Sequence, residues 1–332
     1  MIIVIQVHTR ITYLRHLIVS LAQARDISKA LLIFSHDFYD EEINELVQSI
    51  DFCKVMQIFY PFSIQMHPNE FPGTDPRDCK RDMTMNIALK TNCKNALYPD
   101  IHGHYREASF TQTKHHWWWK ANQVFDHLEV TKNHSGYVLF LEEDHYVAED
   151  FLHVLNLMQK ALPEQCPFCN ILSLGVYDKT INSKTYDKFL ITDWISSKHN
   201  MGMAFNRITW QQIKSCAKEF CTYDDYNWDW SLQYTSQKCL YQRMIALVLM
   251  GPRVYHLGKC NGVHHNNIEC NEDQIIGNIR YRLKESSVFM FPSNIQSRAN
   301  ESLVSLGRIP DLRANGGWSD IRDIIHCLQL CL

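Results

Sequence analysis

Three consecutive carboxylates, Glu142, Glu143 and Asp144, follow a run of strand-forming apolar residues in the segment YVLFLEEDHY. Adjacent acids repel one another unless a cation or hydrogen bonds relieve the repulsion. A hard divalent cation such as Mn²⁺ or Mg²⁺, shared with a diphosphate, would provide that relief. The alternative is a solvated acidic turn after a strand, and the local sequence leaves both interpretations open.

A second candidate for chemistry is Asp229, which stands between two tryptophans in YDDYNWDW. Aromatic rings stack on the apolar faces of sugars, and a carboxylate held between such rings could act as a general base toward a sugar hydroxyl. An acidic, aromatic surface loop is the alternative, and the local pattern fits both equally well.

The segment QTKHHWWWK contains Lys114, His115 and His116, which could meet a phosphate or the edge of a base. Three tryptophans follow directly, at positions 117–119. Consecutive residues of a helix point in different directions, so all three cannot share one face. We therefore expect one or two of them in the core.

Histidines and cysteines also gather late in the chain, where VYHLGKCNGVHHNNIEC contains His256, His264 and His265. A zinc site is one interpretation, but the spacing matches no standard zinc finger. A disulfide beside one metal-binding histidine is the simpler hypothesis. The segment CPFC could be a redox motif, yet it lies in a Pro-containing loop, which favours a structural disulfide.

The composition bounds the class of protein. Twelve cysteines in 332 residues indicate disulfides and an oxidising compartment, in which the sequons at Asn133 and Asn300 would be usable. The net charge of −3 comes with no basic stripe, which argues against a nucleic-acid partner. Neither a signal peptide nor an apolar run of transmembrane length is present, so we expect a catalytic fragment without its N-terminal segment.

The elements that must position these residues follow from periodicity. Apolar runs at 2–7, 30–34 and 55–60 predict strands, and amphipathic stretches between them predict helices. This alternation predicts an α/β fold with an open, mostly parallel sheet. Residues 61–110 read as loops, a helix is expected from about Thr111, and the chain becomes irregular after about Pro252.

Ligands of open parallel sheets bind beyond the carboxyl ends of the strands. Polar residues follow three of the predicted strands, in QVHTR, SHD and EED. Because the first strand is followed by neither a G-x-G-x-x-G nor a G-x-x-x-x-G-K-[ST] pattern, a dinucleotide-binding or P-loop interpretation is weakened.

Taken together, these motifs carry a resemblance. QVHTR, FSHDF, NEFPGTDPRDC, HYREASFTQTKHHWWWK, LFLEEDHY, HNMGMA, CTYDDYNWDW and NGGWSDIRD occur in that order. The chain resembles the N-acetylglucosaminyltransferase II family from about Ile2 to about Cys327. The resemblance implies a single GT-A domain over 1–332, with a Rossmann-like nucleotide-sugar half over about 1–145 and an acceptor-binding and catalytic half over about 146–332.

The resemblance also implies roles for individual residues. Asp229 is expected as the catalytic base, and Asp144 and His256 as protein ligands of Mn²⁺. Nucleotide-sugar contacts are expected from Gln6, Val7, His8, Thr9, Arg10, Asp37, Gln112, Thr113, Lys114, His115, His116, Glu142 and Glu143. Acceptor contacts are expected from Asp100, Asn200, Tyr226 and Trp228.

The implied activity is GlcNAc transfer, with inversion, from UDP-GlcNAc to O2 of the α1,6-arm mannose of an N-glycan on a glycoprotein. The family works in the Golgi lumen and is held there by an N-terminal transmembrane helix that this sequence lacks. Two other functions fit the same residues. An inverting glycosidase would use Asp229 and Glu143 without a metal. An inactive sugar-binding relative would not need all three of Asp144, Asp229 and His256.

The number and spacing of the cysteines lead us to expect five disulfides. The pairs are Cys79 with Cys93, Cys166 with Cys169, Cys216 with Cys239, Cys221 with Cys327, and Cys260 with Cys270. Cys53 is expected to be a buried free thiol. Two departures from the family are notable: residues 177–193 match it poorly, and Cys331 has no counterpart.

Overall fold

The apolar runs of the first 60 residues form parallel strands connected by helices. Strands β1 (Ile2–Val7), β2 (Leu31–His36) and β3 (Lys54–Phe59) pair in parallel, and α1 (Ile11–Gln23) and α2 (Glu41–Gln48) connect them. The computed structural model describes residues 1–177, 185–258, 272–298 and 312–331.

Within these described ranges, nine strands form one sheet in the order β11-β7-β9-β6-β8-β4-β1-β2-β3. Five of its eight neighbouring pairs are parallel, which confirms the predicted open, mostly parallel sheet. Strands from both predicted halves of the chain share this sheet. The remaining strands of the sheet are β4 (Val138–Glu142), β6 (Ile171–Ser173), β7 (Lys188–Asp193), β8 (Met203–Phe205), β9 (Ile245–Leu249) and β11 (Gln296–Ser297).

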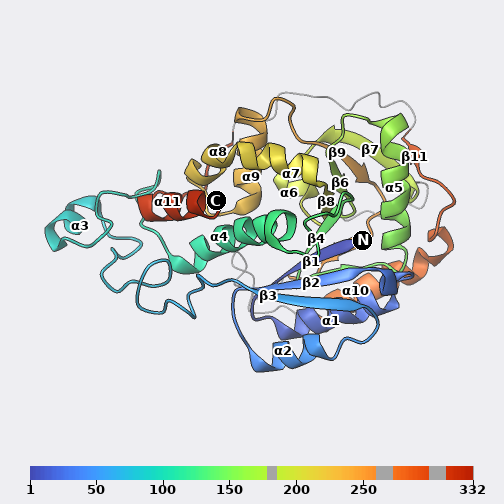
Figure 1. Ribbon diagram of the computed structural model, residues 1–332, viewed down its shortest axis with the longest axis horizontal. Helices are drawn as coiled ribbons and strands as arrows, with labels where there is room; N and C mark the ends of the chain where they lie inside the picture. The colour runs from blue at the N-terminus through green and yellow to red at the C-terminus, as the bar shows by residue number, and fades with distance from the viewer. Residues whose placement is uncertain (178–184, 259–271, 299–311, 332) are drawn as a thin grey trace.

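Helices cover both faces of the sheet (Figure 1). Odd-numbered β1 residues such as Ile3 and Ile5 pack with α1, whereas Ile2 and Val4 pack toward tryptophans of α4. This alternation is the two-residue period of a strand. The other α-helices are α3 (Met85–Thr91), α4 (Ala108–Asn122), α5 (Phe151–Gln165), α6 (Ser196–His199), α7 (Arg207–Ser215), α8 (Ala217–Thr222), α9 (Trp228–Lys238), α10 (Glu272–Glu285) and α11 (Ile321–Gln329).

Helix α4 is enclosed on all sides, which corrects the expectation for the tryptophan triplet. Trp117 stacks on Trp228 with ring centroids 4.6 Å apart, and Trp118 lies 4.3 Å from the ring of Phe220. Trp119 is only 9% exposed and packs against Tyr60 on the third side. All three tryptophans are therefore core residues, because the sheet, α9, α8 and α11 surround the helix.

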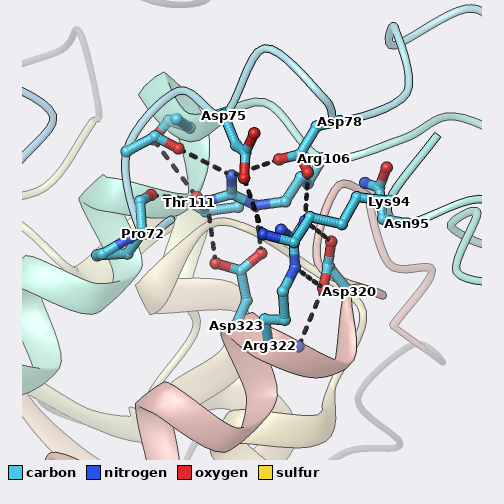
Figure 2. A network of polar contacts seen from close by, with 12 residues as sticks. Pro72, Asp75, Asp78, Lys94, Asn95, Arg106, Thr111, Asp320, Arg322 and Asp323 are labelled. Carbon is cyan, nitrogen blue, oxygen red and sulfur yellow. Dashed lines mark hydrogen bonds and ion pairs between the residues drawn. The ribbon is translucent and has the colours of Figure 1, made fainter. Parts of the chain in front are cut away.

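A buried ion-pair network joins the long loop before α4 to α11 (Figure 2). The Arg106 guanidinium donates to both carboxylate oxygens of Asp323, at 2.7 and 3.2 Å, and lies 3.3 Å from Asp78. Asp323 also accepts a 2.9 Å hydrogen bond from His115. Because Arg106 and Asp323 are buried, this pairing neutralises charges that water does not reach.

Four of the five expected disulfides are confirmed: Cys79–Cys93, Cys166–Cys169, Cys216–Cys239 and Cys221–Cys327. Cys260 and Cys270 lie outside the described residues, as do His264, His265 and Asn300. Cys53 is a free thiol, but it is half-buried rather than buried because it precedes β3 at the rim of the sheet. Among the helices that the structure describes, none combines the length and the hydropathy needed to cross a membrane.

Candidate active site

The carboxyl ends of β1, β2 and β4 gather the candidate residues at one edge of the sheet. Gln6 of β1 stands opposite Ser35 on one side and Glu142 on the other. The chain leaves β4 through Glu143, whose N–H donates to the Gln6 carbonyl at 2.9 Å. The three acids therefore turn out of the sheet directly beside the end of the first strand.

A small two-stranded sheet brings His256 to Asp144. Strand β5 (His145–Val147) pairs antiparallel with β10 (Val254–His256), so that His145 stands opposite His256. The His256 Nε2 atom lies 3.2 Å from Asp144 Oδ2, although the two residues are 112 positions apart in sequence. Although burial opposes a charge on His256, its contact with Asp144 raises the pKa of the imidazole.

The Asp144 carboxylate has the character of a cation ligand. Its Oδ2 atom meets both His256 and the Arg10 guanidinium, the latter at 2.9 Å. Its Oδ1 atom is buried and makes no hydrogen bond within the described residues. Although burial opposes ionisation, His256 and Arg10 hold the pKa of Asp144 well below its usual value. One carboxylate and one imidazole are donors that a divalent cation such as Mn²⁺ accepts.

Glu143 shapes the loop after β1. Its carboxylate accepts the His8 N–H at 2.8 Å and the Arg10 Nε–H at 2.9 Å. The side chain is buried, and burial raises the pKa of Glu143 despite the nearby guanidinium. Glu143 therefore holds the backbone and Arg10 in place.

Asp37, directly after β2, lies between two histidines. His8 Nδ1 is 2.6 Å from Asp37 Oδ1, and His116 Nδ1 is 3.4 Å from Oδ2. His116 Nε2 reaches Ser35 Oγ at 2.7 Å. Although burial opposes ionisation, the two histidines hold the pKa of Asp37 well below its usual value. The resulting carboxylate is an acceptor suited to a ribose or base donor.

Asp229 lies in the first turn of helix α9 and is oriented by two donors. Asn200 Nδ2 donates to Asp229 Oδ2 at 3.0 Å, and the Trp230 N–H donates to Oδ1 at 2.9 Å. Burial, followed by the negative charge of Glu142, raises the pKa of Asp229 to about 7. A half-buried carboxyl group with this pKa is matched to proton transfer near neutral pH.

Tyr177 lies between Asp229 and the pair of Asp144 and His256. Its ring lies 6.1 Å from that of His256. Burial raises the pKa of Tyr177, and the charges of Glu142, Asp229 and Asp144 raise it further. Asp229 and Asp144 therefore act on the same phenol from different segments of the chain.

On the predicted acceptor side, the segments around Asp100 and Gly316 meet the turn at 224–226 that precedes α9. Asp100 accepts hydrogen bonds from the backbone of His102 and His104, both at 2.8 Å, and from Gly317 at 2.7 Å. The half-buried Tyr226 lies against Phe110, with ring centroids 4.8 Å apart. Gly316 has a φ of 81°, and a Cβ atom there would stand 2.4 Å from the Asp100 carboxylate, so that only glycine fits.

The structure places several predicted contact residues away from the strand ends. Lys114 is fully buried and donates to the backbone carbonyls of Tyr223 and Asp225, at 3.1 and 3.0 Å. His115 faces Asp323, as described above. Gln112 accepts the Ile64 N–H at 2.6 Å. Of the segment from Gln112 to His116, only His116 reaches the residues at the ends of β1 and β2 in this structure.

The other residues predicted to contact the donor or the acceptor differ in their exposure to solvent. Val7 is a core residue whose carbonyl accepts the Asp37 N–H at 3.2 Å. Thr9 is exposed and Thr113 half-buried. Trp228 departs from the expectation of an open face for a sugar, because it is 7% exposed and lies flat on Trp117.

Sequence reasoning missed Lys120 and Tyr177. Lys120 is 1% exposed, and its ammonium group donates to the Gln6 side chain. It lies four residues after His116, on the same helix face, and this spacing was the available signal. Tyr177 begins the segment that matches the family poorly, and no signal marked it.

Comparison with known proteins gives a consistent result. The family model of N-acetylglucosaminyltransferase II (MGAT2) matches residues 1–328. The α-1,6-mannosyl-glycoprotein 2-β-N-acetylglucosaminyltransferase of Sus scrofa is 49% identical over 98% of this chain and 72% of its own length. The enzymes of the same name from Homo sapiens and Arabidopsis thaliana are 47% and 34% identical, over 98% and 99% of this chain and 72% and 74% of their own lengths.

Solved structures are more distant. Residues 1–349 of S. aureus TarS in complex with UDP-GlcNAc align with a TM-score of 0.39 and 11% identity, over 88% of this chain and 67% of that chain. A likeness at this level does not bear on function.

Proposed function

The chain belongs to the N-acetylglucosaminyltransferase II family, and on that premise we propose that it transfers GlcNAc from UDP-GlcNAc to O2 of the α1,6-arm mannose of an N-glycan. The observation that carries the mechanism is the placement of Asp229 beside the edge that holds Asp144 and His256. These groups supply a proton acceptor and a cation site for one displacement.

Asp229 is the proposed general base. Each of its carboxylate oxygens already accepts one hydrogen bond and retains a lone pair for the acceptor hydroxyl. The mannose O2 gives its proton to Asp229 as it bonds to the anomeric carbon, and the bond from that carbon to the diphosphate oxygen breaks. One displacement inverts the anomeric carbon, and a base of this kind contributes on the order of 10²- to 10⁴-fold.

Asp144 and His256 are the proposed protein ligands of Mn²⁺. The buried, unpartnered Oδ1 atom of Asp144 supports this assignment. When bound, the cation would supply positive charge to the departing diphosphate. Arg10 lies 2.9 Å from the same carboxylate and adds a fixed positive charge at this edge.

The other residues at the edge are assigned to the donor. Gln6, His8 and Asp37 are proposed to hold the uridine and its ribose, with Glu143 positioning the loop that carries His8. Asp100, Asn200 and Tyr226 are proposed on the acceptor side. We also propose the Golgi lumen as the compartment, and the four disulfides support an oxidising environment.

The test is an assay with UDP-GlcNAc and a defined N-glycan acceptor, with and without Mn²⁺, in which NMR identifies the product linkage. We expect a β1,2-linked GlcNAc on the α1,6-arm mannose only when the metal is present. Free GlcNAc as the main product would support a hydrolase instead, and a different linkage would refute the acceptor assignment.

The metal assignment has its own test in binding. Asp144→Ala should abolish the Mn²⁺-dependent calorimetric binding of UDP while the far-UV circular dichroism stays unchanged. The matched control is Asp26→Ala, which removes an exposed carboxylate far from the site and should bind UDP normally. Unchanged UDP affinity in Asp144→Ala would exclude Asp144 as a ligand.

A further inference from the structure

Lys120 is a buried lysine whose position none of the preceding assignments explains. Its ammonium group donates to the side-chain oxygen of Gln6, and the structure gives it no ion pair within the described residues. Burial lowers the pKa of Lys120 to about 7, while the nearby charges of Glu142 and Asp37 raise it and so favour the ammonium form. Burying an ammonium group that contacts only a neutral amide lowers the stability of the folded protein. The position of Lys120 therefore calls for a functional explanation.

The contact fixes which way the Gln6 amide points. The Lys120 side chain donates to the carbonyl oxygen Oε1 of Gln6, and in its ammonium form it can only donate hydrogen bonds, which excludes the reversed amide. The amide nitrogen then points away from Lys120, and within the described residues it has no hydrogen-bond acceptor. Gln6 is half-buried, so this NH₂ group is open to a ligand.

Two parallel contacts from one helix set this geometry. His116 and Lys120 lie one turn apart on α4 and reach Ser35 and Gln6, which stand opposite each other in β1 and β2. By the strand alternation, Gln6 points to the same face of the sheet as Ile2 and Val4, which is the α4 face. Helix α4 therefore hydrogen-bonds to polar side chains at the ends of both β1 and β2.

We propose that Lys120 is a positioning residue that holds Gln6 with its amide N–H groups toward the nucleotide, where they donate to O4 of uracil. Cytosine carries an amino group at that position, which is a donor and leaves the Gln6 amide without an acceptor. The pair would thus favour uridine over cytidine nucleotides. This inference rests on the proposed UDP-sugar donor and adds the residue that orients its recognition.

The first experiment compares UDP and CDP binding by calorimetry with saturating Mn²⁺. In Lys120→Met the Gln6 amide is free to rotate and no longer holds its N–H groups toward uracil O4. We therefore expect UDP affinity to fall about three- to tenfold, which corresponds to the loss of one hydrogen bond. The preference for UDP over CDP should narrow by a similar factor. The control Lys29→Met removes an exposed lysine at the opposite edge of the sheet and should leave both affinities unchanged.

A double-mutant cycle distinguishes two roles of Lys120, which are orienting the Gln6 amide and attracting the diphosphate directly by its charge. If Lys120 acts through Gln6, Lys120→Met should have no further effect on UDP binding in a Gln6→Ala background. If the full effect persists there, the ammonium acts directly on the diphosphate and the proposal is overturned.

Gln6→Glu provides a second test that does not depend on Lys120→Met folding. It keeps a partner for the ammonium group but removes the donor, so the preference for UDP should be lost. A retained preference would refute the role of Gln6. A wild-type protein that binds neither UDP nor CDP would instead refute the proposed function, so the two failures are distinguishable.

Discussion

The carboxyl group of Asp229 combines an unusual pKa with a fixed orientation. Burial and the charge of Glu142 oppose its ionisation, while Asn200 and the Trp230 N–H hold both oxygens in place. A proton acceptor needs both properties, because its pKa must lie near the working pH and its lone pair must face the hydroxyl.

The substitution Asp229→Asn tests the base at this scale. Asn keeps the shape of the side chain and loses proton acceptance, so kcat should fall at least about a hundredfold, which is roughly 3 kcal/mol of barrier. UDP-GlcNAc affinity, measured by calorimetry, should be retained because the proposed metal ligands and uridine contacts are other residues. A variant that keeps more than about a tenth of wild-type kcat would remove Asp229 from this role.

The raised pKa of Asp229 also predicts a pH profile. Below about pH 7 the carboxyl group is protonated and cannot accept the hydroxyl proton. We therefore expect kcat to fall about tenfold per pH unit below that value and to reach a plateau above it. The measurement needs saturating Mn²⁺ at each pH, because protonated His256 would compete with the cation. A flat profile between about pH 5.5 and 8 would contradict the assignment of Asp229 as the base.

At the scale of elements, α4 and α11 organise the two sides of the site. Helix α4 directs His116 and Lys120 toward the strand ends and Lys114 toward the backbone before Asp229. Helix α11 fixes the loop before α4 through the pair of Arg106 with Asp323 (Figure 2). The acceptor-side loops are therefore held by charged groups that are themselves buried.

Breaking this network should destabilise the protein strongly. Asp323→Asn leaves the buried Arg106 charge without its main partner, so we expect a loss of about 3–5 kcal/mol in the free energy of unfolding, measured in urea. The control Asp82→Asn removes a 73%-exposed carboxylate that pairs with Arg81 and should cost less than about 1 kcal/mol. Equal losses in the two variants would show that burial does not set the strength of the Arg106 pair.

At the scale of the whole molecule, one sheet and one long-range disulfide unite the chain. Antiparallel β8 pairs with both β4 and β6 and so continues the parallel strands into the second half of the chain. The Cys221–Cys327 bond spans 106 positions and ties α11 to the segment that leads to Asp229. The same connection therefore ties the C-terminal helix to the segment that carries the proposed base.

Removing that disulfide should cost more than removing a local one. In the chain-entropy model, the loop closed by Cys221 and Cys327 is worth about 4–5 kcal/mol and that closed by Cys166 and Cys169 about 2 kcal/mol. Urea unfolding of the paired alanine variants, Cys221→Ala with Cys327→Ala and Cys166→Ala with Cys169→Ala, measures the difference. A larger loss in the Cys166 and Cys169 pair would contradict the loop-length argument.

Local sequence patterns predicted the first strands and the polar residues at their ends, but not helices α3, α10 and α11, which lie in stretches expected to be loops or irregular. Apolar runs predicted β1, β2, β3 and β4, and all four strands are confirmed. Strands β1, β2 and β4 are mostly buried, as consecutive apolar residues imply, whereas β3 is a half-buried edge strand. The acids after β4 and four cysteine pairs were also predicted from the sequence and its family motifs. Such signals are local, or they lie in motifs long enough to be recognised.

The partners of the α4 side chains, in contrast, depend on packing against segments distant in sequence. Lys114, His115, His116 and Lys120 are all polar residues of one helix, yet they meet a backbone, an aspartate, a serine and an amide from four different segments. The three tryptophans are all buried because packing surrounds this helix. These outcomes depend on neighbours distant in sequence, and helical periodicity predicts directions but not the partners found along them.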